Sequence, residues 1–139
     1  MNIAVIGQGY VGLPLSMAAA KFGHQVIGID LDEKLVASLN SGLSTISDIS
    51  NEEIASNSKN YKATSNFKEL SGAEIIAICL PAPLDSNKKP DNSFLINALK
   101  SVAENMDNDS LVIIESTISP GTTRGLAQDI LSKSGKKFE

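Results

Sequence analysis

Three glycines near the N-terminus have the spacing that a bound pyrophosphate requires. Gly7, Gly9 and Gly12 follow the apolar pair Val5-Ile6 and precede a run of residues typical of a helix. In such a G-x-G-x-x-G turn the first glycine lets the chain turn sharply out of a strand. The second lets the backbone approach phosphate closely, and the third lets the helix pack against the strand. The spacing predicts a dinucleotide-binding turn, with contacts from Gly7, Gly9, Tyr10, Val11 and Gly12.

An aspartate at the end of the next apolar segment indicates which nucleotide binds. Asp30 follows Val26-Ile27-Gly28-Ile29, where its carboxylate can accept hydrogen bonds from the adenosine ribose hydroxyls. A 2′-phosphate at this place would be repelled, and no arginine follows closely to bind one, so NAD is favoured over NADP. Lys34 is the nearby cation, either as a ribose or phosphate contact or as an exposed lysine on a helix.

Composition bounds the class of protein and its partners. The 139 residues are 42% hydrophobic and 20% charged, which suits one globular domain over residues 1–139. A net charge of −4 without a basic run argues against nucleic acid and anionic membranes, so we expect a small-molecule partner. One cysteine and one histidine exclude an internal disulfide and a structural zinc site, and we expect no metal. No stretch resembles a signal peptide or a membrane span, so a cytoplasmic location is expected.

Strand-like and helix-like segments alternate along the whole chain. Strands are predicted at residues 3–6, 26–30, 61–64, 74–80 and 111–114, the last two as buried strands. Helices are predicted at residues 15–22, 33–39, from Ser50 onward, 67–70, 94–105 with a cap from Asp91-Asn92-Ser93, and from Ser119-Pro120 to about Ser132. This order predicts an α/β fold, a Rossmann-type doubly wound parallel sheet with helices on both faces.

Four places meet at one edge of such a sheet, because ligands bind beyond the carboxyl ends of parallel strands. They are the glycine turn, Asp30, the segment Leu80-Pro81-Ala82-Pro83, and Ser116-Thr117. We therefore add Leu80, Pro81, Ala82, Pro83, Ser116 and Thr117 to the predicted cofactor-binding residues.

An ordered set of motifs covers the chain. It comprises residues 7–15 (GQGYVGLPL), Gly28-Ile29-Asp30, residues 39–42 (LNSG), residues 79–84 (CLPAPL), Lys89-Pro90-Asp91 with Ser93, Glu115-Ser116-Thr117, and residues 120–123 (PGTT). Together they resemble the N-terminal NAD-binding domain of the UDP-glucose/GDP-mannose dehydrogenases. The residues after the glycine turn, the Asp91 loop and the Glu115 to Thr123 stretch are most similar to the branch that oxidises UDP-N-acetylglucosamine or UDP-N-acetylmannosamine.

The resemblance implies an oxidoreductase of polysaccharide biosynthesis. Enzymes of this family oxidise the sugar C6 hydroxyl to a carboxylate with two NAD, through an aldehyde and a thioester on a cysteine. The family's cysteine, its lysine and asparagine helpers, the central dimer-forming helix and the UDP-sugar-binding domain fall outside this sequence. The chain is therefore expected to be a domain fragment of a homodimeric enzyme and to be inactive alone.

Individual residues carry different expectations. By resemblance Thr117 lies near the nicotinamide and holds a catalytic water; the alternative is a hydroxyl that caps the following turn. Cys79 is assigned to packing within a buried strand, and His24 to a turn. Ala82 stands where the family usually has threonine, and Asn92 where it prefers leucine or methionine.

Three alternatives remain open. One is a UDP-glucose 6-dehydrogenase, and another is a hydroxyacid or 6-phosphogluconate type dehydrogenase, against which Tyr10 and Asp30 speak. The third is a stand-alone NAD-binding or redox-sensing module without catalysis.

Overall fold

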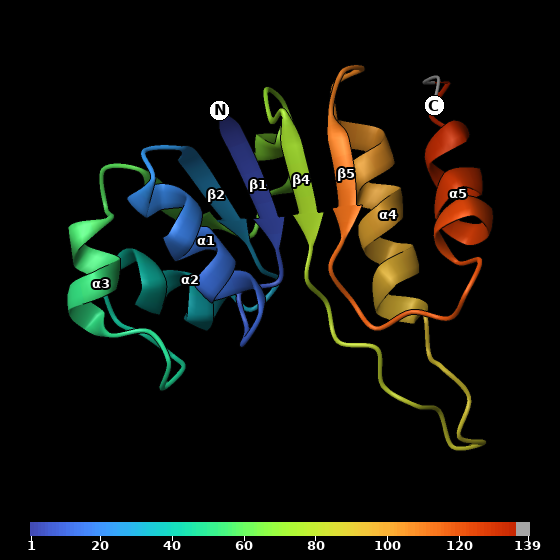
Figure 1. The fold of residues 1–139 in the computed structure, drawn as a ribbon, viewed down its shortest axis with the longest axis horizontal. Helices are drawn as coiled ribbons and strands as arrows, with labels where there is room; N and C mark the ends of the chain where they lie inside the picture. The colour runs from blue at the N-terminus through green and yellow to red at the C-terminus, as the bar shows by residue number, and fades with distance from the viewer. Residues whose placement is uncertain (136–139) are drawn as a thin grey trace.

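Five short parallel strands form the centre of the computed structural model, which describes residues 1–135 (Figure 1). They are β1 (Asn2–Ile6), β2 (Gln25–Ile29), β3 (Tyr61–Thr64), β4 (Ile75–Ile78) and β5 (Leu111–Ile114). Their order across the sheet is β3-β2-β1-β4-β5, and every neighbouring pair is parallel. The chain thus winds outward from β1 in both directions, which confirms the predicted doubly wound sheet.

Helices cover both faces of the sheet, as predicted. On one face lie α1 (Gly12–Lys21), α2 (Glu33–Asn40) and α3 (Asn51–Ser56); on the other lie η1 (Phe67–Leu70), α4 (Ser93–Asn105), the π-helical turn η2 (Thr123–Ala127) and α5 (Gln128–Ser132). Side chains of β1 alternate between two cores, because successive residues of a strand point to opposite faces. Val5 packs in the core under α1, and Ile6 in the core under α4.

Local signals in the sequence set several boundaries correctly. Gly23 follows α1 with φ of +85°, and Gly42 follows α2 with φ of +77°, a left-handed conformation that glycine adopts without steric cost. The Ser50 hydroxyl accepts the N–H of Glu53 at 3.1 Å and so caps α3.

The prediction that β5 is buried like β4 was wrong. β5 is an edge strand, and Leu111 at its start is 57% exposed. Val112 and Ile114 pack into the core with α4 and α5. On the opposite face, α1, α2 and α3 pack over β1, β2 and β3 and do not reach β5. Among the described residues, β5 is therefore covered on one face only.

The predicted start of the last helix was also wrong. Ser119-Pro120 forms a turn, in which the Ser119 carbonyl accepts the N–H of Thr122, and helical residues begin only at Thr123. Gly121, with φ of +86°, separates the two because no helix continues through a left-handed residue. The predicted start of α4 is confirmed to within one residue, and in its predicted cap the Asp91 carboxylate accepts the N–H of Ser93 at 2.9 Å.

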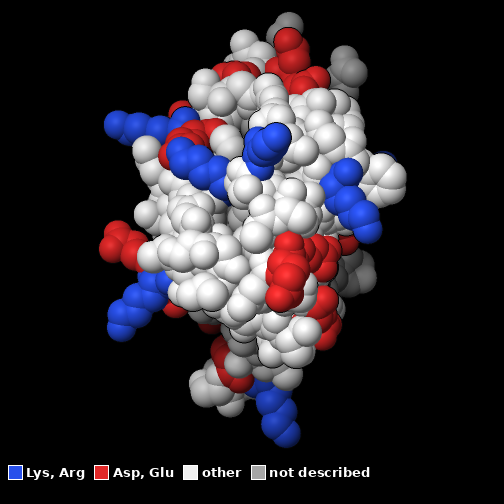
Figure 2. Space-filling model, turned by 90° about the vertical axis from the view of Figure 1, so that its left-hand side faces the viewer, with Lys and Arg blue, Asp and Glu red and all other residues white. Residues whose placement is uncertain are grey.

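One face of the molecule carries charged side chains of both signs. On the face seen in Figure 2, lysine and arginine side chains lie apart from one another and are interspersed with aspartate and glutamate. Within residues 1–135, no helix is both long and apolar enough to span a membrane.

Candidate cofactor-binding site

The four predicted places do converge at the carboxyl edge of the sheet, where the strand arrows end in Figure 1. Backbone hydrogen bonds extend the sheet one residue beyond the strands at this edge. Gly7 N–H donates to the Ile29 carbonyl at 2.7 Å, and Cys79 N–H donates to the Ile6 carbonyl at 2.8 Å. Glu115 N–H likewise donates to the β4 end. The glycine turn therefore lies between the ends of β2 and β4.

The three glycines of the turn are needed for three different reasons. Gly7 has φ of +89°, and a Cβ there would lie 2.5 Å from the Cys79 carbonyl oxygen. A Cβ on Gly12 would overlap the Gly7 carbonyl. Around Gly9, in contrast, a Cβ would meet no other atom of residues 1–135 within 4 Å. The fold itself requires Gly7 and Gly12, whereas Gly9 leaves open space in front of α1 of the kind that an approaching pyrophosphate needs.

The glycine turn also carries backbone N–H groups that are available to a ligand. The N–H groups of Gly9, Tyr10 and Val11 donate to no acceptor among residues 1–135. They directly precede α1, whose N-terminal end carries the positive pole of the helix dipole. Unsatisfied N–H groups at such an end are suited to bind phosphate oxygens.

Asp30 is held firmly beside the turn. Its Oδ2 accepts the N–H of Gln8 at 2.8 Å, and its Oδ1 accepts the N–H of Asp32 at 3.0 Å. Each oxygen keeps a further lone pair with which to accept a ribose hydroxyl. Lys34 lies nearby on α2 with an exposed side chain, and within the described residues its backbone N–H donates to Asp32 at 2.9 Å.

On the other side of the turn, one serine joins β4 to β5. The Ser116 hydroxyl accepts the N–H of Leu80 at 3.2 Å and donates to the Leu80 carbonyl at 2.8 Å. The side chain of Thr117, next along the chain, is exposed and has no hydrogen-bond partner within residues 1–135. The alternative role of Thr117, a hydroxyl that caps the following turn, is therefore absent from the described structure, in which this hydroxyl lies unbonded at the edge of the sheet.

Leu80 also contacts the glycine turn. A Cβ on Gly7 would come within 3.1 Å of a Leu80 methyl group. The residues that follow, Pro81, Ala82 and Pro83, continue beyond the sheet; the two prolines are exposed and Ala82 is half-buried. Ser116, Leu80 and Gly7 thus form a continuous series of contacts from β5 to β1.

Cys79 and His24 are not suited to catalysis. Cys79 is 8% exposed; burial, with a smaller contribution from the charge of Glu115, raises the pKa of its thiol to about 11. Such a thiol stays protonated at neutral pH and is a poor nucleophile. His24 lies in the turn between α1 and β2, at the amino edge of the sheet. The predicted burial of Cys79 and the turn position of His24 are confirmed, although Cys79 directly follows β4 and does not lie within it.

Sequence reasoning missed Gln8, a completely buried polar residue between the first two glycines of the turn. Its Oε1 accepts the hydroxyls of Tyr61, at 2.8 Å, and of Ser16, at 3.2 Å. Burial, with a smaller contribution from Asp30, raises the pKa of Tyr61 above its usual range. The one available signal was Gly28, a glycine in the middle of an apolar strand.

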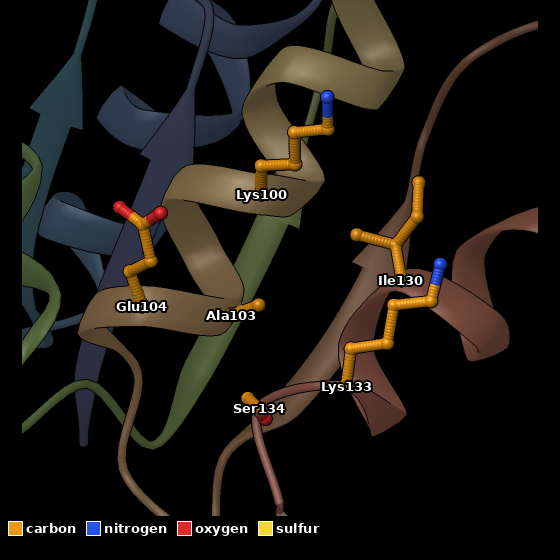
Figure 3. Close-up of a pocket in the computed structure, with 6 residues that line it drawn as sticks. All are labelled: Lys100, Ala103, Glu104, Ile130, Lys133 and Ser134. Atoms are coloured by element: carbon orange, nitrogen blue, oxygen red, sulfur yellow. The ribbon is translucent and has the colours of Figure 1, made fainter.

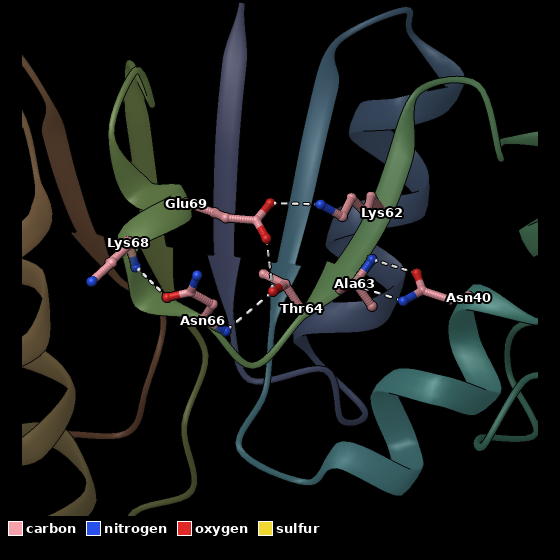
Figure 4. A network of polar contacts seen from close by, with 7 residues as sticks. All are labelled: Asn40, Lys62, Ala63, Thr64, Asn66, Lys68 and Glu69. Carbon is pink, nitrogen blue, oxygen red and sulfur yellow. Dashed lines mark hydrogen bonds and ion pairs between the residues drawn. The ribbon is translucent and has the colours of Figure 1, made fainter.

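A second polar cluster closes the β3 edge of the sheet (Figure 4). The Asn40 amide bonds with both the N–H and the carbonyl of Ala63, each at 2.9 Å. The Glu69 carboxylate accepts hydrogen bonds from the Lys62 ammonium group at 2.8 Å and from the Thr64 hydroxyl at 3.0 Å. The bond from Lys62 is the main cause of the lowered pKa of Glu69. Glu69 thus bonds with two side chains of β3 and Asn40 with its backbone, and together they stabilise the strand that neighbours β2.

A hollow of about 420 Å³ between α4 and α5 lies elsewhere (Figure 3). It is lined by Lys100, Ala103, Glu104, Ile130, Lys133 and Ser134. These residues come from the C-terminal part of α4, from α5 and from the two residues after it, and hence from the amino edge of the sheet. None of them is a predicted site residue. Within residues 1–135, no group of three or more His, Cys, Asp or Glu side chains is placed to hold a metal ion.

The whole sequence matches one family model, the NAD binding domain of the UDP-glucose/GDP-mannose dehydrogenase family, over residues 1–139. The chain belongs to this family. This membership shows NAD to be the cofactor of the domain.

Individual relatives agree with the family match. The UDP-N-acetyl-D-mannosamine dehydrogenase of Pyrococcus horikoshii is 42% identical over 132 residues, covering 92% of this chain and 31% of the relative. The UDP-N-acetyl-D-glucosamine 6-dehydrogenase of Pseudomonas aeruginosa is 33% identical, and the match covers 99% of this chain and 32% of the relative. The solved structure of the Pyrococcus horikoshii UDP-D-ManNAc dehydrogenase matches with a TM-score of 0.85 at 39% identity. The match covers 95% of this chain and 33% of that structure's chain. The chain thus spans about a third of the length of these relatives.

Proposed function

We propose that NAD lies across the carboxyl edge of the sheet, with its pyrophosphate on the glycine turn. The observation that carries this proposal is the open space at Gly9, together with the N–H groups of Gly9, Tyr10 and Val11, which have no acceptor within residues 1–135. Gly7 and Gly12 shape the turn, and Asp30 accepts the ribose hydroxyls. Lys34, which is exposed on α2, contacts the ribose or a phosphate.

The β4 and β5 ends form the nicotinamide side of the proposed site. When bound, NAD supplies an acceptor for a hydride from the substrate. Leu80, Pro81, Ala82 and Pro83 line this side through their backbone, and Ser116 holds that segment through Leu80. Thr117 is the supporting catalytic residue: its free, exposed hydroxyl orients a water near the reacting carbon.

The whole protein is proposed to be a UDP-N-acetylhexosamine 6-dehydrogenase. Relatives named for UDP-N-acetyl-D-mannosamine and UDP-N-acetyl-D-glucosamine support this substrate class. In this proposal the domain works with a second, UDP-sugar-binding domain, the protein is a cytoplasmic homodimer, and two NAD are reduced for each sugar oxidised. The present domain binds the cofactor, and the nucleophilic cysteine comes from outside residues 1–139.

The test is an assay of NADH formation with the longer protein that contains this domain. We expect turnover with UDP-N-acetylmannosamine or UDP-N-acetylglucosamine, two NADH per sugar, and less turnover with UDP-glucose. Thr117→Ala should lower kcat without weakening NAD, since its hydroxyl acts on water rather than on the adenosine. A preference for UDP-glucose would contradict the substrate assignment, and an effect on NAD affinity alone would contradict the role of Thr117.

The isolated domain should form no NADH with any of these sugars. Its one thiol, Cys79, is buried and protonated at neutral pH. NADH formation that disappears in a Cys79→Ser variant would contradict both the proposed division of labour and the packing role of Cys79.

A further inference from the structure

Gln8 is the centre of a buried polar network beneath the glycine turn. Its Nε2 donates to the Val5 carbonyl at 2.9 Å, and its Oε1 accepts the hydroxyls of Tyr61 and Ser16. All four residues are buried. One side chain therefore joins the end of β1 to α1 and to β3, which follows Gln8 in the sequence by more than fifty residues.

Strand β2 is shaped to admit this network. Gly28 pairs with Val5 in the sheet and lies on the same face as Gln8 and Tyr61. A Cβ on Gly28 would lie 2.5 Å from the Gln8 Oε1 and 2.7 Å from the Tyr61 hydroxyl oxygen. Glycine weakens the middle of a strand, so its presence here is explained by the space that the network occupies.

The backbone of Gln8 holds the residue that recognises the ribose. While the carboxamide is fixed below the turn, the Gln8 N–H donates to the Asp30 Oδ2 at 2.8 Å. The position of this N–H depends on the position of the whole residue. The network therefore controls both the path of the turn and the orientation of the Asp30 carboxylate.

We propose that Gln8, supported by Tyr61, is a positioning residue of the NAD site. This inference rests on the proposed site. Its side chain is buried on the protein side of the turn and acts through the turn backbone and through Asp30. A turn that is fixed before the cofactor arrives loses less conformational freedom on binding, which increases affinity. The network thus contributes to NAD affinity, in addition to the stability of the fold.

Calorimetric titration of NAD into matched variants tests the proposal. Tyr61→Phe removes one hydroxyl from β3 and should weaken NAD about 3- to 5-fold, while Gln8→Met removes the whole amide and should weaken it about tenfold. If Tyr61 acts through Gln8, adding Tyr61→Phe to the Gln8→Met variant should weaken NAD no further.

Asn40→Ala is the control for a loss of stability alone. It removes two hydrogen bonds to Ala63 of the same strand, β3, on the edge away from β2. It should lower the melting temperature and leave the NAD Kd unchanged.

The outcomes separate this inference from the site itself. A wild-type domain that binds NAD, with Tyr61→Phe and Gln8→Met variants that lower the melting temperature at unchanged Kd, would overturn the positioning role alone. Equal weakening by Asn40→Ala would also overturn it. A wild-type domain that binds no NAD would contradict the proposed site and the inference with it. If Gln8→Met does not fold, the comparison of Tyr61→Phe with Asn40→Ala decides.

Discussion

The glycine turn and the β4–β5 segments lie along one edge of the sheet but are held in different ways. The turn is fixed from below by buried Gln8 and from the side by Asp30, through hydrogen bonds of 2.8 to 3.2 Å. The backbone pairing of β4 with β5 ends at Glu115, beyond which Leu80 is held by the single hydroxyl of Ser116, and the chain after Leu80 is largely exposed. The adenosine–pyrophosphate side of the site is therefore preformed to a greater extent than the nicotinamide side.

The largest effect is expected at Gly9. Gly9→Val should weaken NAD by more than about 100-fold, because the side chain would occupy the space of the pyrophosphate. The domain should stay folded, because among the residues that the structure describes a Cβ there meets no atom within 4 Å. Calorimetry and circular dichroism together measure this. In contrast, Gly12→Ala should disrupt the fold, and an unfolded Gly9→Val variant would show that Gly9 also serves the backbone.

Asp30→Ala should weaken NAD by about 1.5 to 3 kcal/mol, the usual contribution of hydrogen bonds to a charged group. ADP-ribose, which lacks the nicotinamide, should lose the same amount, because Asp30 acts on the adenosine side. The exposed neighbour Glu33 provides the control, and Glu33→Ala should change neither affinity. Unchanged NAD affinity in Asp30→Ala would remove Asp30 from the site.

Cys79 makes stability depend on alkaline pH. Its thiol pKa is raised to about 11 in the folded state, so the unfolded chain ionises first as the pH rises above about 9. The free energy of unfolding therefore keeps its full value below pH 9. Between pH 9 and pH 11 it decreases, by an amount on the order of 1 to 2 kcal/mol. Urea unfolding at pH 8 and 10.5 should show a smaller decrease in the free energy of unfolding for Cys79→Ala than for wild type. Any decrease caused by Tyr61 is the same in the two proteins and cancels in the comparison. Equal decreases would refute the assignment.

The smallest effect is expected from Ser116→Ala, about 3- to 5-fold weaker NAD with unchanged ADP-ribose affinity. The variant frees Leu80 on the nicotinamide side only. Ser110→Ala is a matched control, since the Ser110 hydroxyl bonds to the Ala73 carbonyl at 2.7 Å near the opposite end of the same two strands. Equal loss of NAD and ADP-ribose affinity in Ser116→Ala would show that the two sides of the site are not independent.

Features that depend on local sequence and on parallel topology were predicted well. The glycine spacing, the apolar strands and Asp30 sufficed to predict the sheet and the meeting of four segments at one edge. The exposure of β5 depends on which strands the helices cover, and the late start of the last helix depends on the left-handed Gly121. The Gln8–Tyr61 contact joins residues far apart in the sequence, and the Ser116 hydroxyl bonds to a different strand, so spacing alone indicates neither.

The central claim is that this edge of the sheet binds NAD through the glycine turn and Asp30. Calorimetric titration of the wild-type domain with NAD and with NADP tests it most directly. We expect NAD to bind, and NADP to bind at least about tenfold more weakly, because the 2′-phosphate would lie beside the Asp30 carboxylate. Absence of NAD binding, or equal affinity for the two nucleotides, would contradict the account.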